Sequence, residues 1–248
     1  MKRFIPLAFP LIFGPVAPAL SQEASTRATI YVWATEVNEE LSNGVKATAS
    51  RKTVLENLKF GLMGEVVQTR GEWIYGVEGF YANVGKSGEG SYPVQSGEPS
   101  QSSSIDVLAD FDTKTTFFNG FIGYRIATSP VFNLYGTAGL RYTIFENELT
   151  VDAAGQSYRF KTNDHLTDGT VGFRGRYTIN ESWSVPFATD VGAGDSDLTW
   201  QAYAGLSYRS GQNEFTLGWR HMEWDLGDHE LITNISYDGP VIAYSRRF

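Results

Sequence analysis

The chain has 248 residues, of which 42% are hydrophobic and only 19% are charged, a composition that excludes a disordered or highly charged protein. It contains 26 glycines and 14% aromatic residues, which together favour β-structure with many tight turns. The absence of cysteine excludes disulfides, thiolate metal sites and a cysteine nucleophile. The net charge of −8 argues against a nucleic acid as partner.

The N-terminal segment has the pattern of a secretory signal peptide. Two basic residues precede an apolar run that prolines interrupt, so a membrane-spanning helix is disfavoured there. Small residues within Ala19-Leu20-Ser21 occupy the positions that a signal peptidase reads, and residues 17–19 offer a competing site. We predict a signal peptide over residues 1–21 and an outer-membrane β-barrel over residues 22–248, with a retained membrane anchor as the alternative.

The following sequence alternates apolar with small or polar residues at a period of two, in runs of about ten residues or slightly more. In the clearest run, from Phe132 to Ile144, one face is apolar and the other carries Asn, Thr, Gly and Arg141. This pattern fits strands with a lipid-facing side and a polar interior. The predicted strands are 28–36, 60–70, 72–84, 113–128, 131–149, 167–179, 182–192, 197–209, 213–225 and 231–248.

The links between these strands alternate between short and long. Short, tight links occur at residues 70–72, 128–130, 180–182 and 210–212, and longer ones at residues 85–112, 150–166, 192–197 and 226–230. Short periplasmic turns and long outer loops are typical of outer-membrane barrels. The fold class that we predict is therefore all-β, an antiparallel transmembrane up-and-down β-barrel of ten strands with both chain ends on the periplasmic side.

Residues 37–59 are predicted to form an external excursion, because one more spanning strand would place the short turns outside. Asn43-Gly44 is a hairpin-type dipeptide, and Val45 to Ala49 could form another strand. Residues 53–58 have a capping residue, Thr53, and apolar spacing for a short helix. A barrel of eight strands, with 28–36 and one neighbour inside it, is the alternative.

The predicted last strand carries apolar and aromatic residues on one parity and ends in Phe248. An aromatic terminus on an amphipathic strand resembles the signal read by the bacterial barrel-assembly machinery, and Tyr244 and Phe248 would form it. The expected partners are this machinery during biogenesis and the lipid and lipopolysaccharide of a Gram-negative outer membrane.

Five sequence blocks resemble those of a proteobacterial outer-membrane β-barrel family of no established activity. They are Trp73–Gly79, Gly139–Tyr142, Asp190–Gln201, Leu217–Arg220 and Gly239–Ile242. The likeness extends over nearly all of the predicted mature chain, with mild departures at Ala193 and in the last four residues. The resemblance implies the fold and the outer-membrane location, and adds little on function.

The parity of the strands predicts that a set of opposite charges faces the lumen. Its members are Glu65, Glu78, Arg125, Arg141, Arg174, Arg176, Asp190, Arg209 and Arg220. Because the lumen of a small barrel is narrow and an isolated buried charge is costly, these groups are expected to pair. We predict a non-enzymatic structural protein with a largely plugged lumen. Since arginines outnumber carboxylates in this set, a small anion-favouring pore is an alternative.

The three histidines, His165, His221 and His229, fall near the outer ends of strands or in outer loops. An omptin-like outer-membrane hydrolase, which would use Asp and His across the barrel mouth, is therefore a further alternative. Asp164-His165 cannot itself be a dyad, because adjacent strand residues point to opposite faces. His221 lies on the lipid parity, where no serine or carboxylate is expected beside it.

No catalytic residue, cofactor or metal site is predicted. The acidic residues of the outer segments, Asp168 among them, are expected to be solvated. The six tryptophans are expected in the wall or in its interfacial girdles rather than in a ligand cage.

Overall fold

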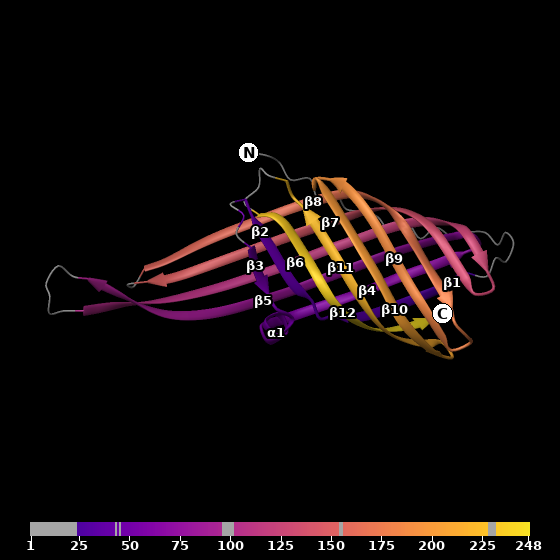
Figure 1. Cartoon of the computed structure of the whole chain (residues 1–248), viewed down its shortest axis with the longest axis horizontal. Helices are drawn as coiled ribbons and strands as arrows, with labels where there is room; N and C mark the ends of the chain where they lie inside the picture. The colour runs from indigo at the N-terminus through magenta and orange to yellow at the C-terminus, as the bar shows by residue number, and fades with distance from the viewer. Residues whose placement is uncertain (1–23, 43, 45, 96–101, 154–155, 228–231) are drawn as a thin grey trace, which may run out of the picture.

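The structure, a computed structural model, describes residues 24–42, 44, 46–95, 102–153, 156–227 and 232–248. Ten antiparallel strands close into a barrel, in which β1 pairs with both β4 and β12 (Figure 1). These strands are β1 (Ala24–Trp33), β4 (Leu58–Arg70), β5 (Trp73–Gln95), β6 (Ser102–Ser129), β7 (Phe132–Ala153), β8 (Gln156–Thr178), β9 (Trp183–Gly194), β10 (Leu198–Ser210), β11 (Asn213–Asp225) and β12 (Ile232–Arg247). The predicted ten-stranded barrel is confirmed, and the predicted signal peptide over residues 1–21 lies outside the described residues.

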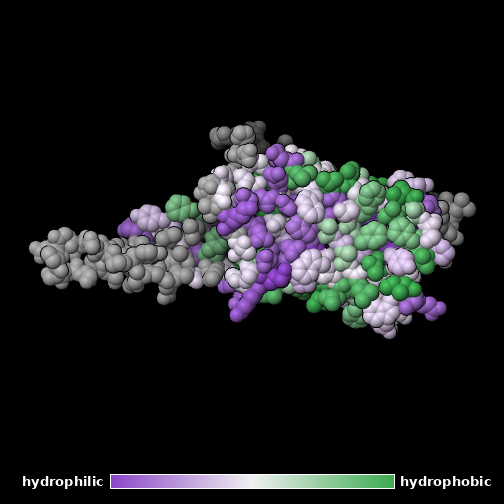
Figure 2. All heavy atoms as spheres, in the orientation of Figure 1, coloured by the Kyte–Doolittle hydropathy of each residue, from purple (hydrophilic) through white to green (hydrophobic). Residues whose placement is uncertain are grey.

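The alternation of the sequence determines which side of the wall each residue occupies. On β7, Leu140 points outward and is 64% exposed, whereas the neighbouring Arg141 points inward and is fully buried. Val171 and Ile242 likewise expose most of their apolar surface on the outside. Figure 2 shows hydrophobic residues gathered over one half of the barrel. In the described ranges, no helix has both the length and the apolar character needed to cross a membrane.

The four short turns that the sequence predicts are confirmed to within a residue or two, and they lie at one end of the barrel. Gly71 and Gly211 adopt φ angles of 58° and 61° there, a backbone conformation that favours glycine. The beginning of β1 pairs beside Arg70 and Arg247, so both ends of the barrel wall lie at this same end. We call it the short-turn end, and the opposite one the long-loop end.

The predicted first strand, 28–36, is wrong at both bounds. β1 ends at Trp33, and β12 continues its pairing with a separate strand, β2 (Glu36–Leu41), which forms a hairpin with β3 (Lys46–Ala49). This hairpin extends the wall beside β12 without spanning the barrel, so the prediction of ten strands rather than eight is the correct one. The excursion is structured because β12 is longer than β1 and offers unpaired backbone groups above it.

A short helix, α1 (Arg51–Glu56), follows the hairpin, two residues earlier than predicted. Its N-cap is Ser50 rather than Thr53, and the Thr53 backbone N–H donates to the Ser50 hydroxyl at 3.3 Å. Arg51 extends over the outside of the wall, where it pairs with Asp238 at 3.6 Å and lies 4.9 Å from the Trp219 ring centroid.

Two segments predicted as long loops, 85–112 and 150–166, are largely strand. β5 stays paired with β6 as far as Gln95 and Ser102, and β7 with β8 as far as Ala153 and Gln156. Hydrophobic alternation fades there because the strands leave the apolar belt, yet backbone pairing does not require it. We call residues 85–95, 102–112, 146–153 and 156–167 the four-strand extension, which projects from the long-loop end (Figure 1).

Candidate functional site in the barrel lumen

A cluster of aromatic side chains lies inside the long-loop half of the barrel. The Phe80 and Phe117 rings stack with centroids 4.7 Å apart, and the edge of Phe145 meets Trp224 at 5.3 Å. Tyr237 packs against Trp224 and shares a 2.7 Å hydrogen bond with the Thr115 hydroxyl. The aromatic cluster, as we call it, consists of Trp33, Phe80, Phe117, Phe145, Trp224 and Tyr237.

Two of the six tryptophans therefore do not belong to a girdle. Trp33 and Trp224 are 2% and 0% exposed and belong to this interior cluster. Their inward parity was readable from the sequence, but a tryptophan at the end of a strand is also what an interfacial girdle requires.

Below this cluster, six side chains from six strands join into a closed circuit of hydrogen bonds that crosses the lumen. The members of this interior ring are Glu78, Arg220, Gln201, Asp190, Arg141 and Asn119. β5, β11, β10, β9, β7 and β6 contribute one residue each, in that order around the circuit.

The charged members of the interior ring are fully compensated. Arg220 binds both oxygens of Glu78, at 2.5 and 3.0 Å, and Arg141 donates to Asp190 at 2.5 Å and to Asn119 at 3.0 Å. Two guanidinium groups face two carboxylates, so the ring is formally neutral. Removing one partner of a buried ion pair typically destabilises a protein by about 3–5 kcal/mol, because the other charge stays buried and unpaired. The matching of charges is therefore what permits such deep burial.

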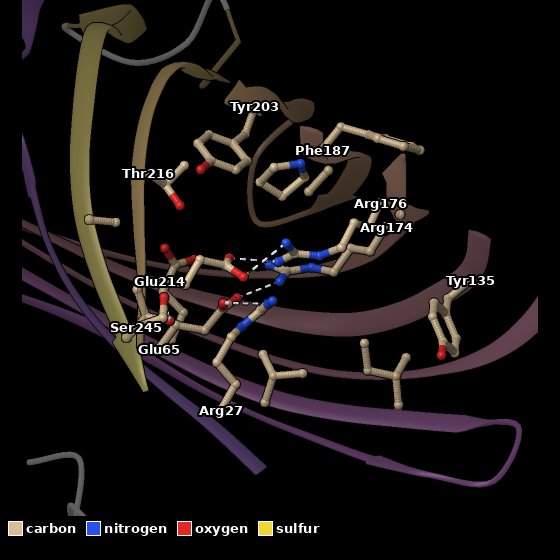
Figure 3. A pocket seen from close by; sticks show the side chains of 18 of the residues that line it. Arg27, Glu65, Tyr135, Arg174, Arg176, Phe187, Tyr203, Glu214, Thr216 and Ser245 are labelled. Atoms are coloured by element: carbon tan, nitrogen blue, oxygen red, sulfur yellow. Dashed lines mark hydrogen bonds and ion pairs between the residues drawn. The ribbon is translucent and has the colours of Figure 1, made fainter. Parts of the chain in front are cut away.

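Between the interior ring and the short-turn end lies a cavity of about 370 Å³ (Figure 3). On one side Glu65 pairs with Arg174 and lies 4.0 Å from Arg27. On the other, Glu214 receives two hydrogen bonds from Arg176, at 2.8 and 3.0 Å, and one from Arg247 at 3.3 Å. We call this space the lower cavity.

The nine residues predicted to form a lumen charge network are distributed over three places. Glu78, Arg141, Asp190 and Arg220 join the interior ring, and Glu65, Arg174 and Arg176 line the lower cavity. Of the last two, Arg125 also lines the lower cavity but forms its ion pair with Glu72 at 3.2 Å, and Arg209 belongs to neither group. They donate to the Gly71 and Glu181 carbonyl oxygens, at 2.9 and 2.8 Å, and so fasten short turns.

Sequence reasoning missed several partners of these charges. Glu214 shares the parity of Arg220 on β11 and could have been found by extending that alternation to the start of the strand. Arg27 was missed because the first strand was expected to begin one residue later. Asn119 and Gln201 carry no charge, and only the geometry of the closed barrel reveals that they bridge the ionic groups.

Asp168 is not solvated, contrary to the expectation for the acids of the outer segments. It is fully buried and accepts hydrogen bonds from the Ser196 backbone N–H at 2.9 Å and hydroxyl at 2.7 Å. Asp195 accepts from the Thr167 N–H at 2.8 Å. These contacts fasten the link between β9 and β10 to β8, which is a structural role for much of the Asp190–Gln201 block.

The described histidines lie on the outside of the wall. His165 shares a 2.9 Å hydrogen bond with the Tyr142 hydroxyl, and His229 lies outside the described residues. The expectation that His221 lacks a carboxylate neighbour is wrong, because the register of β11 and β12 places Asp238 directly opposite it. Its ring lies between Asp238 at 3.4 Å and Glu223 at 3.3 Å.

No protein-family model and no curated protein matches this sequence. Among solved structures, the translocator domain of the autotransporter NalP from Neisseria meningitidis is 10% identical with a TM-score of 0.46, over 91% of this chain and 88% of that one. Ail, the attachment invasion locus protein of Yersinia pestis, is 12% identical with a TM-score of 0.38, over 91% and 98%. Neisserial surface protein A is 12% identical with a TM-score of 0.34, over 91% and 97%. The solved structures that this chain resembles are outer-membrane β-barrels of proteobacteria, and the likeness is one of fold.

Proposed function

We propose that the protein is a structural, non-enzymatic barrel of a Gram-negative outer membrane, with a lumen that is largely plugged. The observation that carries this proposal is the succession of two interior layers, the aromatic cluster and the interior ring. Each layer takes side chains from opposite sides of the barrel. Phe117, Trp224 and Arg141 are at most 1% exposed, as expected where no continuous water path runs past them.

The outside of the barrel supports the membrane location. Exposed apolar residues such as Leu62, Leu140 and Leu217 cover the wall, as lipid contact requires. Aromatic pairs such as Trp73 with Tyr124 and Trp183 with Tyr208, both with centroids 5.0 Å apart, lie next to the short turns, where an interfacial girdle belongs. Outer-membrane lipid and lipopolysaccharide are the partners that such a surface would take.

Planar-bilayer recording tests the plug. The purified unmodified protein should give no steady single-channel current. A variant combining Phe117→Ala and Trp224→Ala with Arg141→Ala and Asp190→Ala should conduct, because it truncates side chains in both the aromatic cluster and the interior ring. Its net charge is unchanged, since one arginine and one aspartate are removed. Steady currents from the unmodified protein would overturn the plug, and anion-favouring ones would support the small pore instead.

The non-enzymatic part of the proposal is supported by the position of the histidines. His165 and His221 lie outside the wall, and their side-chain partners in the described chain are Tyr142, Asp238 and Glu223, none of which faces the lumen. Peptide cleavage by the purified protein, lost on replacement of His165, His221 or His229 by Ala, would contradict this part of the proposal.

A further inference from the structure

The lower cavity opens toward the short-turn end. Its lining runs from the buried pair Glu78 and Arg220 of the interior ring to Thr69, Asn133 and Arg247, each within a few residues of a short turn or of the chain end. Its volume of about 370 Å³ falls in the range of 300–1,000 Å³ that is usual for small-molecule sites. A solute entering from this end would meet the cavity before the interior ring.

The charges of the lower cavity are unequal. Around the cavity, Glu65 forms ion pairs with both Arg27 and Arg174. Glu214 forms ion pairs with both Arg176 and Arg247. Four guanidinium groups thus share two carboxylates, which leaves two positive charges uncompensated within these pairings. In the interior ring, by contrast, the charges match one to one.

These guanidinium groups converge on the same space. Figure 3 shows Arg27 of β1 extending toward Arg174 and Arg176 of β8, with Glu65 and Glu214 between them. Their side chains are 25%, 19% and 18% exposed, so they border open space rather than packed protein. Guanidinium donors that are not saturated by carboxylates can bind an anionic oxygen in two-point geometry.

Part of the remaining wall is apolar or aromatic. Tyr135 and Tyr203 line the cavity (Figure 3), and Arg174 lies 4.0 Å from the centroid of Phe121. Flat walls combined with excess guanidinium charge favour a ligand with a planar apolar body and two anionic groups.

We propose that the lower cavity is a binding site for small ring-bearing dicarboxylates entering from the short-turn end. One carboxylate of the ligand pairs with Arg27 and Arg174, and the other with Arg176 and Arg247. Tyr203 packs against the ring. The site goes beyond the structural role proposed above, since binding from one end does not require or exclude passage through the lumen.

Isothermal titration calorimetry on the full chain, recovered from membranes in a neutral detergent, tests the site. The probe is benzene-1,3-dicarboxylate, compared with benzoate and with uncharged benzamide. We expect the dicarboxylate to bind about tenfold or more tightly than benzoate, since its second carboxylate forms a further charge-assisted pair with the arginines, and we expect benzamide not to bind. Equal affinity for all three probes, or no dicarboxylate binding at millimolar concentration, would overturn the proposal.

Two substitutions with opposite expected effects separate binding from folding. Arg176→Gln should weaken dicarboxylate binding about tenfold, whereas Glu214→Gln should strengthen it by a similar factor, because it frees two guanidinium groups for the ligand. Arg209→Gln is the matched control, since Arg209 faces inward but does not line the cavity, and it should leave the affinity unchanged.

Heat-modifiable gel migration establishes that each variant is folded. If Arg176→Gln fails to fold, Arg247→Gln replaces it, because Arg247 is 33% exposed at the cavity mouth and less tied to the core. Affinity changes of the same sign for the arginine and the glutamate substitutions would refute the site. Calorimetry measures binding and not conductance, so a negative result would refute this site without refuting the plugged lumen. A conducting barrel would likewise refute the plug without refuting the site.

Discussion

Arg141 illustrates how a long charged side chain becomes fully buried inside a membrane-type barrel. Each of its three guanidinium nitrogens donates to a different strand: Nε to Asn119, Nη1 to Thr199 at 2.6 Å and Nη2 to Asp190. Asp190 is held in turn by Gln201. The ion pair is thus embedded in neutral hydrogen-bonding groups, which is the condition under which buried charges are tolerated.

Replacing Arg141 with Ala should destabilise the barrel by about 3–5 kcal/mol, because it leaves the Asp190 carboxylate in the lumen without its cationic partner. Denaturant titration of the folded protein in detergent, followed by tryptophan fluorescence, measures the loss. Arg209→Ala should change the unfolding free energy far less, since Arg209 makes one hydrogen bond at the exposed rim. Equal effects of the two substitutions would show that the ring adds nothing to stability.

For single residues, the sequence predicts which side of the wall a side chain occupies but not which residue it pairs with. Parity alone places Glu78, Arg141 and Arg220 inward, because strand side chains alternate strictly. It cannot show that Glu78 on β5 meets Arg220 on β11, since that contact crosses the lumen and depends on barrel diameter and strand stagger. The outward pair His221 and Asp238 was missed for a related reason, because it depends on the register between two strands.

Among the elements, β12 has the most complex pairing. It contacts β11 along its length, β1 near its C-terminal end and β2 farther up. Phe248, just past its end, exchanges backbone hydrogen bonds with Thr26 at 2.8 and 3.3 Å, while its ring is 70% exposed. The last residue therefore helps to close the seam with β1 through its backbone, while its side chain stays exposed.

Phe248→Asp should reduce the amount of heat-modifiable protein in the membrane fraction, because the exposed ring is the feature that the assembly machinery would bind. Phe248→Tyr, which retains the ring, is the control and should assemble normally. Wild-type levels for the Asp variant would show that the terminal ring is dispensable. The refolding yield of the same variant in detergent, where no machinery acts, should remain close to wild type.

The four-strand extension carries ion pairs on its outward face. The Glu148 carboxylate binds Lys161 at 2.8 Å and Arg159 at 3.1 Å across β7 and β8. The hydrogen bond from Lys161, aided by the nearby positive charges, lowers the pKa of Glu148 below its ordinary value. The Glu148 ion pairs therefore stabilise the hairpin of β7 and β8 at pH values above the usual pKa of a carboxyl group. This stabilisation is lost as the pH falls through the lowered pKa.

Amide hydrogen exchange of residues 146–161, corrected for the intrinsic rate at each pH, should therefore accelerate as the solution is acidified through this range. Glu148→Gln should remove most of that pH dependence and leave the exchange of the barrel strands unchanged. Exchange that slows on acidification would contradict the assigned role of Glu148.

How far an element could be predicted depended on its surroundings. Within the apolar belt, strands such as β9 and β11 were predicted within two residues of their bounds, because an apolar exterior over a polar interior imposes strict alternation. Beyond the belt both faces meet water, and the Ser- and Gly-rich part of β5 and β6 looks like a loop although it pairs. β2 depends on the unpaired part of β12, a feature of the assembled sheet that no local pattern reveals.

The whole molecule combines an apolar exterior with a polar and aromatic interior, the reverse of a water-soluble domain. We therefore expect it to fractionate with the outer membrane and to migrate differently on gels before and after heating. Recovery of folded protein from the soluble periplasm would overturn the location, and with it the proposed structural role.

The four-strand extension also has an evolutionary consequence. Beyond Val84 on β5 and Asp168 on β8, its outer edges have no strand beside them in the described chain, whereas every barrel strand is held on both sides near the short-turn end. β5 continues for about 35 Å beyond Val84, at roughly 3.3 Å per residue. Paired residues can be gained or lost there without altering the closure of the barrel, so descendants of one ancestral barrel could differ in height above the membrane. Changes of two residues on each paired strand would also preserve which face each side chain occupies, so the extension is where lineages can diverge in length most freely.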